Sequence, residues 1–254
     1  MKLGVVYVCP VVNWPQYEGL TRRFVSSYTM FPAEFPHKLH VVFNGGNPNV
    51  DILALFSDKN PVYLAHDNIG WDIGAFQKAA SSVDCNPILF LGANTHFRRA
   101  GWLRRLMAAY EKFGPGLYGP SASFDITPHI RTTAFMCDPK LVRSWAGKIS
   151  APKDRHYFEV GPASLTSLAK RQGLPCVLVT WDGFYLRDEW RKAPNIFRRG
   201  DQSNCLMFDR HHEIYEASTP QQKIRLGRIA DGNKLEYYRC AIQSRINRWF
   251  KSRG

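Results

Sequence analysis

The sequence predicts an α/β protein whose mainly parallel sheet is flanked by helices. Short apolar, β-branched runs alternate with helix-like segments through residues 1–113, and such alternation is typical of parallel sheets built from strand–helix units. A polar or turn-forming cluster follows each of these runs. The carboxyl ends of parallel strands share one edge of the sheet, which is where such folds bind ligands. The sequence therefore predicts a fold and the edge at which its site lies.

The expected elements follow in chain order. In the first half the expected strands are 3–8, 40–43, 61–64 and 87–91, and the expected helices are 17–28, 50–56, 75–81 and 99–113. Beyond residue 114 the pattern predicts short strands at 117–120, 133–136 and 177–180, helices at 141–146 and 162–171, loops over 181–204, and a last helix at 235–250. We expect one domain over residues 1–230, followed by a basic amphipathic helix within 231–254.

Composition narrows the class of protein. The chain has 254 residues, is 44% apolar and carries a net charge of +13, which favours a polyanionic partner such as a phosphorylated ligand. The six cysteines are scattered without a C-x-x-C pair, so neither a zinc site nor a disulfide framework is predicted. No run reaches the roughly 18–20 apolar residues of a membrane span, and the N-terminus does not resemble a signal peptide. We expect a reduced, cytoplasmic protein.

The segment 65–76 is the strongest motif in the chain. It joins an expected strand to an expected helix and contains Asn68, Gly70, Asp72 and Gly74. Glycine lets the backbone approach a ligand closely, and a strand-to-helix turn presents free N–H groups to anions or sugar oxygens. The same spacing also fits a tight turn with a helix cap, without any ligand.

Three segments together resemble a GT-A glycosyltransferase, and more narrowly the rhamnan synthesis protein F type of bacterial polysaccharide enzyme. Residues 68–76 resemble its N-x-G-x-D-x-G-A-F signature, and residues 88–95 stand where GT-A enzymes carry a strand that ends in Asp-x-Asp. Residues 156–173 resemble its Y-E-x-x-L run near the acceptor site. The resemblance implies transfer of a sugar from a UDP-, TDP- or GDP-linked donor, with inversion, and Glu159 as the general base.

The resemblance also implies where the donor binds. The candidate donor-binding residues are Asn44, Asp67, Asn68, Gly70, Asp72, Gly74, Asn94 and Arg131. Gly92-Ala93-Asn94 replaces the usual metal-binding Asp-x-Asp, so dependence on Mg²⁺ or Mn²⁺ is left open. Asn94 and His212 are the candidate ligands, although Asn94 lacks the charge that hard cations prefer. Arginine and lysine side chains are the alternative stabilisers of the leaving diphosphate.

The expected acceptor is a hydroxyl of a growing cell-surface polysaccharide, such as lipopolysaccharide, or of a lipid-linked glycan. His129 and Arg131 are candidate phosphate or acceptor contacts. The basic C-terminal helix is expected either to lie on the anionic inner face of the cell membrane or simply to pack on the domain. The competing hypothesis is a non-catalytic module, either a degenerate GT-A domain or a nucleic-acid binder, although no nucleic-acid-binding motif is visible.

Overall fold

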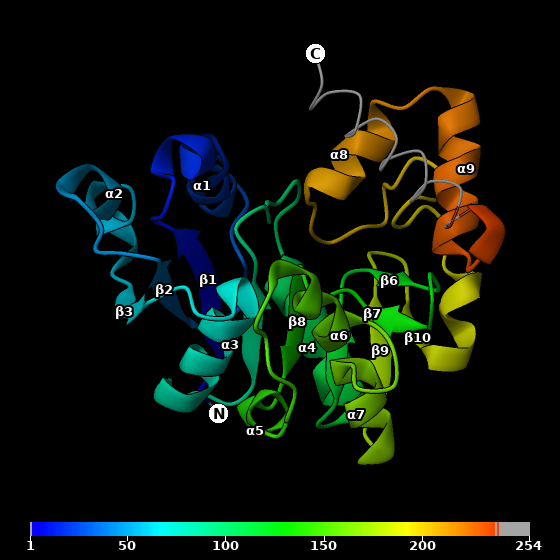
Figure 1. The fold of residues 1–254 in the computed structure, drawn as a ribbon, viewed down its shortest axis with the longest axis horizontal. Coiled ribbons are helices and arrows are strands. Elements are labelled where there is room, and N and C mark those ends of the chain that lie inside the picture. The colour runs from blue at the N-terminus through cyan, green and yellow to red at the C-terminus, as the bar shows by residue number, and fades with distance from the viewer. Residues whose placement is uncertain (1, 237, 239–254) are drawn as a thin grey trace.

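The computed structural model describes residues 2–236 and 238, and it confirms the predicted α/β class (Figure 1). Its main strands are β1 (Gly4–Pro10), β2 (Lys38–Asn44), β3 (Val62–His66), β4 (Ile88–Leu91), β5 (Leu117–Gly119), β8 (Ala134–Cys137), β9 (Cys176–Val179) and β10 (Phe184–Leu186). They form one sheet in the order β10-β9-β5-β8-β4-β1-β2-β3. Two shorter strands, β6 (Ala122–Ser123) and β7 (His129–Ile130), pair separately.

The sheet is mixed in direction. The pairs β1–β2, β2–β3, β1–β4 and β5–β9 are parallel, as the strand–helix alternation predicts. In contrast, β8 is antiparallel to both β4 and β5, and β10 is antiparallel to β9. The strand β8 therefore joins the N-terminal parallel half of the sheet to the C-terminal half.

Helices cover the sheet and extend beyond its upper edge in Figure 1. They are α1 (Trp14–Met30), α2 (Val50–Ala54), α3 (Trp71–Ser82), α4 (Trp102–Phe113), α5 (Pro139–Arg143), α6 (Arg155–Glu159), α7 (Leu165–Arg171), α8 (Arg210–Glu216) and α9 (Pro220–Ala230). Short 3₁₀ turns occupy 57–59, 152–154 and 187–192. The segment with α8 and α9 lies above the sheet in Figure 1, so it covers one side of the edge formed by the carboxyl ends of the parallel strands.

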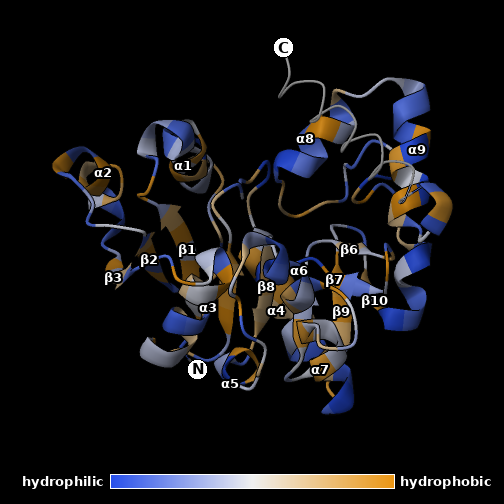
Figure 2. Ribbon diagram, in the orientation of Figure 1, coloured by the Kyte–Doolittle hydropathy of each residue, from blue (hydrophilic) through white to orange (hydrophobic). Residues whose placement is uncertain are grey.

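The central strands β1, β2, β4 and β8 are buried on both faces, which explains why they read as continuous apolar runs. The strand β3, whose apolar run predicted a buried strand, is instead a largely exposed edge strand. Along β1, Val6 and Val8 enter the core that contains α3, whereas Tyr7 and Cys9 enter the core that contains α1 and α4. The Tyr7 ring stacks on Phe24 of α1, with 3.7 Å between the ring centroids. Figure 2 shows the hydrophobic colours concentrated in the strands, with hydrophilic stretches on the outer helices.

The structure corrects several expected boundaries. The helix after residues 65–70 begins at Trp71 rather than at 75, so the motif continues into the helix itself. Residues 181–204 are not only loops, because they contain β10 and the 3₁₀ turn at 187–192. The helices α6, α8 and α9 fall in segments for which no helix was predicted.

The expected C-terminal helix lies almost entirely outside the described residues. Of the expected unit 231–254, only 231–236 and 238 are described, and its contact with a membrane therefore stays a prediction. Within the described part of the chain, no helix combines the length and apolar character needed to cross a bilayer.

Candidate functional site

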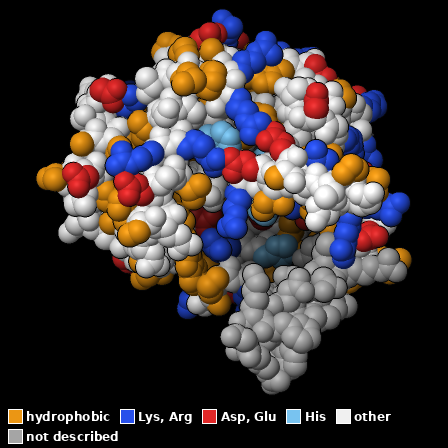
Figure 3. Space-filling view, turned by 90° about the horizontal axis from the view of Figure 1, so that it is seen from above, with side chains coloured by type: hydrophobic (Ala, Val, Ile, Leu, Met, Phe, Trp, Pro, Cys, Tyr) orange, Lys and Arg blue, Asp and Glu red, His pale blue; other side chains and the backbone are white. Residues whose placement is uncertain are grey.

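A cleft of about 520 Å³ opens at the carboxyl end of β4, bordered by α3, α6 and α8. This is the edge at which the sequence predicts a site. Figure 3 looks onto this face and shows basic and acidic side chains around a hollow in which histidine surfaces are visible. The cleft is lined by Asp72, Ile73, Asn94, Arg131, Thr132, Thr133, Pro152, Lys153, Arg155, His156, Glu159, Asp209, Arg210, His211 and Ile214.

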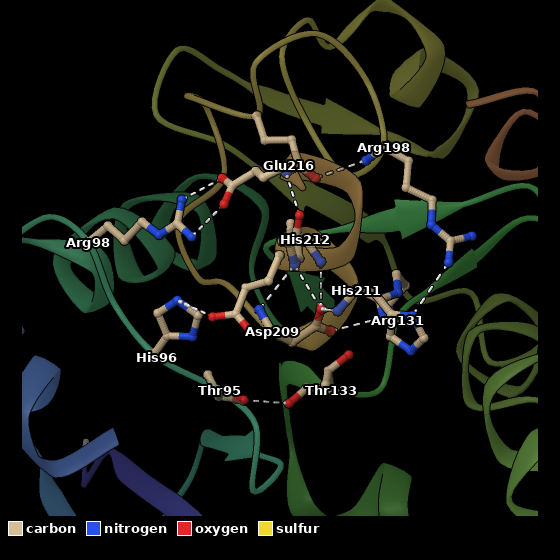
Figure 4. A network of polar contacts seen from close by, with 12 residues as sticks. Thr95, His96, Arg98, Arg131, Thr133, Arg198, Asp209, His211, His212 and Glu216 are labelled. Carbon is tan, nitrogen blue, oxygen red and sulfur yellow. Dashed lines mark hydrogen bonds and ion pairs between the residues drawn. The ribbon is translucent and has the colours of Figure 1, made fainter. Parts of the chain in front are cut away.

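The turn after β4 forms part of the cleft wall. The Gly92 N–H donates a hydrogen bond to the Thr133 carbonyl oxygen at 2.8 Å, and the Thr95 hydroxyl donates to the same oxygen at 3.1 Å. These bonds fix the turn to the chain entering β8 (Figure 4). As a result, Asn94 and Thr133 line the cleft together, although they lie far apart in the sequence.

Glu159 lies in the cleft wall, in a helix that the sequence did not predict. It is the last residue of α6, so stabilisation by the positive end of that helix's dipole does not explain its charge. Its side chain is 30% exposed, and Oε1 lies 3.6 Å from Nε2 of the buried His129. Burial opposes ionisation of Glu159, but His129, Arg131 and Thr132 outweigh it and lower the pKa of Glu159 to about 2.

His129 lies against the Glu159 carboxylate, in surroundings that favour its protonated form. Its Nδ1 lies 2.7 Å from the Thr127 carbonyl oxygen, which can only accept a hydrogen bond, so Nδ1 carries a proton. Its Nε2 faces the carboxylate. Burial lowers the pKa of His129, but the adjacent Glu159 carboxylate and then the charge of Asp125 raise it above the ordinary histidine value. The two residues therefore form a carboxylate–imidazole pair at the edge of the cleft.

A second buried ion pair connects the sheet to α8. Arg131 Nη2 lies 2.9 Å from Asp209 Oδ2, and both side chains are at least nine-tenths buried. The Asp209 carboxylate also accepts hydrogen bonds from the backbone N–H groups of His211 and His212 at the start of α8, as Figure 4 shows. Although burial opposes ionisation, Arg131 and His212 lower the pKa of Asp209 well below its usual value. This pair fixes the start of α8 over the cleft.

The two candidate metal ligands have different surroundings. Asn94 lines the cleft, whereas the buried His212 places Nδ1 at 2.9 Å from Asp209 and packs against Phe197 and Phe208. Across residues 2–236 and 238, no cluster of three or more His, Cys, Asp or Glu side chains is arranged to hold a metal ion.

The candidate donor-binding residues divide into two groups. Asp72, Asn94 and Arg131 line the cleft, and Asp72 pairs with Arg155 at 3.1 Å. Asn44 and Asn68 lie outside the cleft lining, at the neighbouring strand ends, where Asn44 Nδ2 donates to Asn68 Oδ1 at 2.8 Å.

The other three motif positions have local structural roles. Gly70 precedes α3 with φ 77°, a left-handed conformation that glycine adopts without strain. A Cβ on Gly74 would lie 1.9 Å from the Ile69 carbonyl oxygen, so only glycine fits there. The exposed Asp67 accepts a hydrogen bond from the Ile69 N–H at 3.0 Å. The tight-turn alternative thus accounts for both glycines and for Asp67, but not for Asp72.

The sequence did not identify several residues of the cleft. Lys153, Arg155 and Arg210 are exposed at its rim. His211 also lines the cleft, and its Nδ1 lies 3.4 Å from Arg198 Nη2. Because arginine can only donate, Nδ1 of His211 is the acceptor. His211 adjoins the candidate ligand His212 in the sequence, whereas for Lys153, Arg155 and Arg210 the only advance signal was the general basic excess.

Comparison with known proteins gives similarity in fold only. No protein-family model matches the chain, and no curated protein matches it in sequence. Among solved structures, Staphylococcus aureus TarS 1–349 in complex with UDP aligns with 12% identity and a TM-score of 0.46, covering 62% of this chain and 54% of that one. The chain thus spans about half of that structure.

Two further structures are similar at the same level. A Bacillus anthracis protein described as a putative glucose-1-phosphate thymidylyltransferase, in complex with sucrose, aligns with 9% identity and a TM-score of 0.47, covering 68% of this chain and 84% of that one. Mouse xyloside xylosyltransferase 1 aligns with 10% identity and a TM-score of 0.43, covering 68% and 82%. Such values carry no conclusion about activity, which must rest on the site.

Proposed function

We propose that this protein is a GT-A-type glycosyltransferase that uses a nucleotide-sugar donor. The observation that carries the proposal is the cleft at the carboxyl end of β4, where an ionised and partly exposed Glu159 lies among cationic side chains. Sugar transfer needs both features, namely a base for the acceptor hydroxyl and positive charge for the leaving diphosphate. The sequence resemblance of residues 68–76 and 156–173 supports the same activity.

The proposed reaction is a single displacement. Glu159 accepts the proton of the acceptor hydroxyl while the acceptor oxygen forms a bond to the anomeric carbon of the donor sugar. The bond from that carbon to the phosphate oxygen breaks, and the nucleoside diphosphate leaves with the bonding electrons. Attack on the face opposite the leaving group inverts the anomeric carbon. No step in this scheme is assigned to a metal ion.

The side chains of the cleft have complementary proposed roles. Arg131, Lys153 and Arg210 would stabilise the negative charge of the diphosphate, because all three line the cleft. Asp72 and Asn94 would bind donor hydroxyl groups. Asn44 and Asn68 are proposed to contact the nucleotide at the ends of β2 and β3.

The proposed donor is linked to UDP, TDP or GDP, and the acceptor is a hydroxyl of a cell-surface polysaccharide or a lipid-linked glycan. These finer assignments, including rhamnan synthesis, a cytoplasmic location and attachment to the inner membrane face, rest on the sequence resemblance and the basic C-terminus.

Thermal unfolding with a panel of UDP, GDP, TDP and CMP, each with and without Mn²⁺, tests the proposal. A ligand that binds the native state raises the melting temperature by mass action, so we expect a shift with one nucleoside diphosphate. Dependence of that shift on Mn²⁺ would show that a metal contributes. No shift with any nucleotide, together with salt-sensitive binding to RNA or DNA, would favour the nucleic-acid-binding alternative instead.

A further inference from the structure

We propose that Asp125 and His129 are positioning residues for Glu159, forming a three-residue charge cluster behind the cleft; this inference rests on the proposed role of Glu159 as base. His129 Nε2 lies 3.6 Å from Oε1 of Glu159 and 3.6 Å from Oδ1 of Asp125. The imidazolium thus lies between two carboxylates, of which only Glu159 lines the cleft. Neither Asp125 nor the His129–Glu159 pairing belongs to a sequence motif.

The cluster is built into the fold by contacts around it. The Asp125 carboxylate accepts a hydrogen bond from the Ser123 hydroxyl at 3.0 Å. Thr127 contacts both His129 and the chain that follows Glu159. Its carbonyl oxygen accepts a hydrogen bond from His129, and its hydroxyl accepts one at 2.9 Å from the N–H of Gly161, just beyond the end of α6. The same loop therefore fixes the imidazole ring and the chain that carries Glu159.

The loop also contains a strained residue. Ile126, between Asp125 and Thr127, has φ 62°, a left-handed conformation that is rare for a β-branched residue. Such a conformation persists only when its surroundings enforce it, and it occurs most often at functional sites. The two residues that flank Ile126 both contact His129, Asp125 through its side chain and Thr127 through its carbonyl oxygen.

The arrangement sets the charge and direction of the proposed base. Glu159 is faced by His129 and Arg131, by the Thr132 hydroxyl, and at longer range by His211. His129 and Thr132 direct the carboxylate and keep it ionised. Asp125 supplies the second negative charge that keeps His129 cationic when Glu159 takes up the acceptor proton. Without Asp125, that protonation would leave a buried, uncompensated imidazolium, which is costly.

Histidine NMR of the intact protein tests the cluster without any substrate. We would follow both ring nitrogens of His129 from acidic to alkaline pH in the wild type and in the Glu159→Gln and Asp125→Asn variants, assigning the signals by their loss in His129→Gln. We expect both nitrogens to be protonated at neutral pH in the wild type, and the pKa of His129 to fall in both variants. Glu111→Gln, the same change at an exposed site on α4, should leave it unchanged. A neutral His129, or a titration that neither variant alters, would overturn the proposal.

A kinetic measurement tests the positioning role itself, with the nucleotide sugar that the thermal panel selects. In His129→Gln, kcat should fall roughly tenfold to a hundredfold, as for other groups that orient a reacting side chain, while the Kd for the free nucleoside diphosphate stays at its wild-type value. The acid limb of the pH profile of kcat should move to higher pH in this variant, because the pKa of Glu159 rises when the positive charge of His129 is removed. An unshifted limb would count against the role. If no nucleotide binds at all, the proposed function fails, whereas the NMR spectra still decide whether the cluster exists.

Discussion

At the scale of single residues, the main finding is how charge is arranged around Glu159. A carboxylate whose pKa is about 2 is ionised at every physiological pH, so it is always available to accept a proton. The same pKa makes it a weak base, since general bases work best near the ambient pH. An acceptor bound against the carboxylate would displace water from it and raise its basicity again.

The Glu159→Gln substitution should separate chemistry from binding. Because glutamine cannot accept the acceptor proton, we expect kcat to fall by roughly 10²–10⁴-fold, the usual contribution of a general base. The Kd of the nucleoside diphosphate, measured by calorimetry, should stay at its wild-type value, and Glu111→Gln serves as the matched control. An equal loss of nucleotide affinity would indicate a binding role for Glu159 instead.

The sequence predicted some of these residues and not their partners. Glu159 was identified through its resemblance to a known motif, and it does line the cleft. Its pairing with His129 joins residues 30 positions apart in the chain, and no periodicity or spacing rule reaches that far. The Arg131–Asp209 pair was missed for the same reason, since it depends on α8 folding back over the sheet.

At the scale of secondary-structure elements, the turn into α3 combines residues that shape the backbone with one residue that lines the cleft. Gly70 and Gly74 are explained by backbone conformation and close packing. Asp72, on the first turn of the same helix, lines the cleft instead. The motif thus forms a tight turn that places the Asp72 carboxylate in the lining of the cleft.

Two glycine-to-alanine substitutions test this division. In Gly74→Ala the new Cβ would collide with the Ile69 carbonyl oxygen, so we expect a loss of roughly 1–3 kcal/mol in the free energy of unfolding, as for other overpacked sites. In the control Gly19→Ala, on the exposed face of α1, nothing lies within 4 Å, and helix propensity predicts a gain of up to about 1 kcal/mol. Urea unfolding measures both. A neutral Gly74→Ala would refute the packing explanation.

Elements marked by a continuous apolar run or a helical stripe were predictable from the sequence. The buried strands β1, β2, β4 and β8 and the helix α4 overlap the expected segments, because continuous burial or a helical stripe leaves a pattern in the sequence. Strands as short as β6, β7 and β10 leave no such pattern. The helix α9 does carry a start signal in its sequence, since Thr219 and Gln222 form a capping box around Pro220.

At the scale of the whole molecule, ion pairs from separate elements hold α8 over the sheet. Glu213 pairs with Arg23 of α1, and Glu216 pairs with Arg98 at 2.8 Å. The Arg131–Asp209 pair described above fixes the start of the same helix. Between these pairs, His96 is buried against Phe208, with its Nε2 3.9 Å from Glu213. The position of α8, and with it one wall of the cleft, thus depends on charge.

His96 should make the protein less stable in mild acid. Burial, together with the charges of Arg23 and Arg98, lowers the pKa of His96 from 6.5 to about 4 in the folded state. As the pH falls through this interval the unfolded chain binds a proton that the folded chain does not, so the free energy of unfolding decreases by at most about 1.4 kcal/mol per pH unit. Urea unfolding should show a shallower decrease in His96→Gln than in the wild type. Equal slopes would contradict this assignment.

The place of β8 in the sheet has a consequence for synthesis on the ribosome. The strands β3, β2, β1 and β4 can assemble as soon as the first 91 residues have emerged, but the outer edge of β4 is completed only by β8, which is translated later. Until then the nascent chain presents the apolar Ile88–Leu91 as an open edge, the kind of surface that promotes aggregation. Protection by a chaperone, or rapid translation through residue 137, would therefore determine how much of the chain reaches the native state.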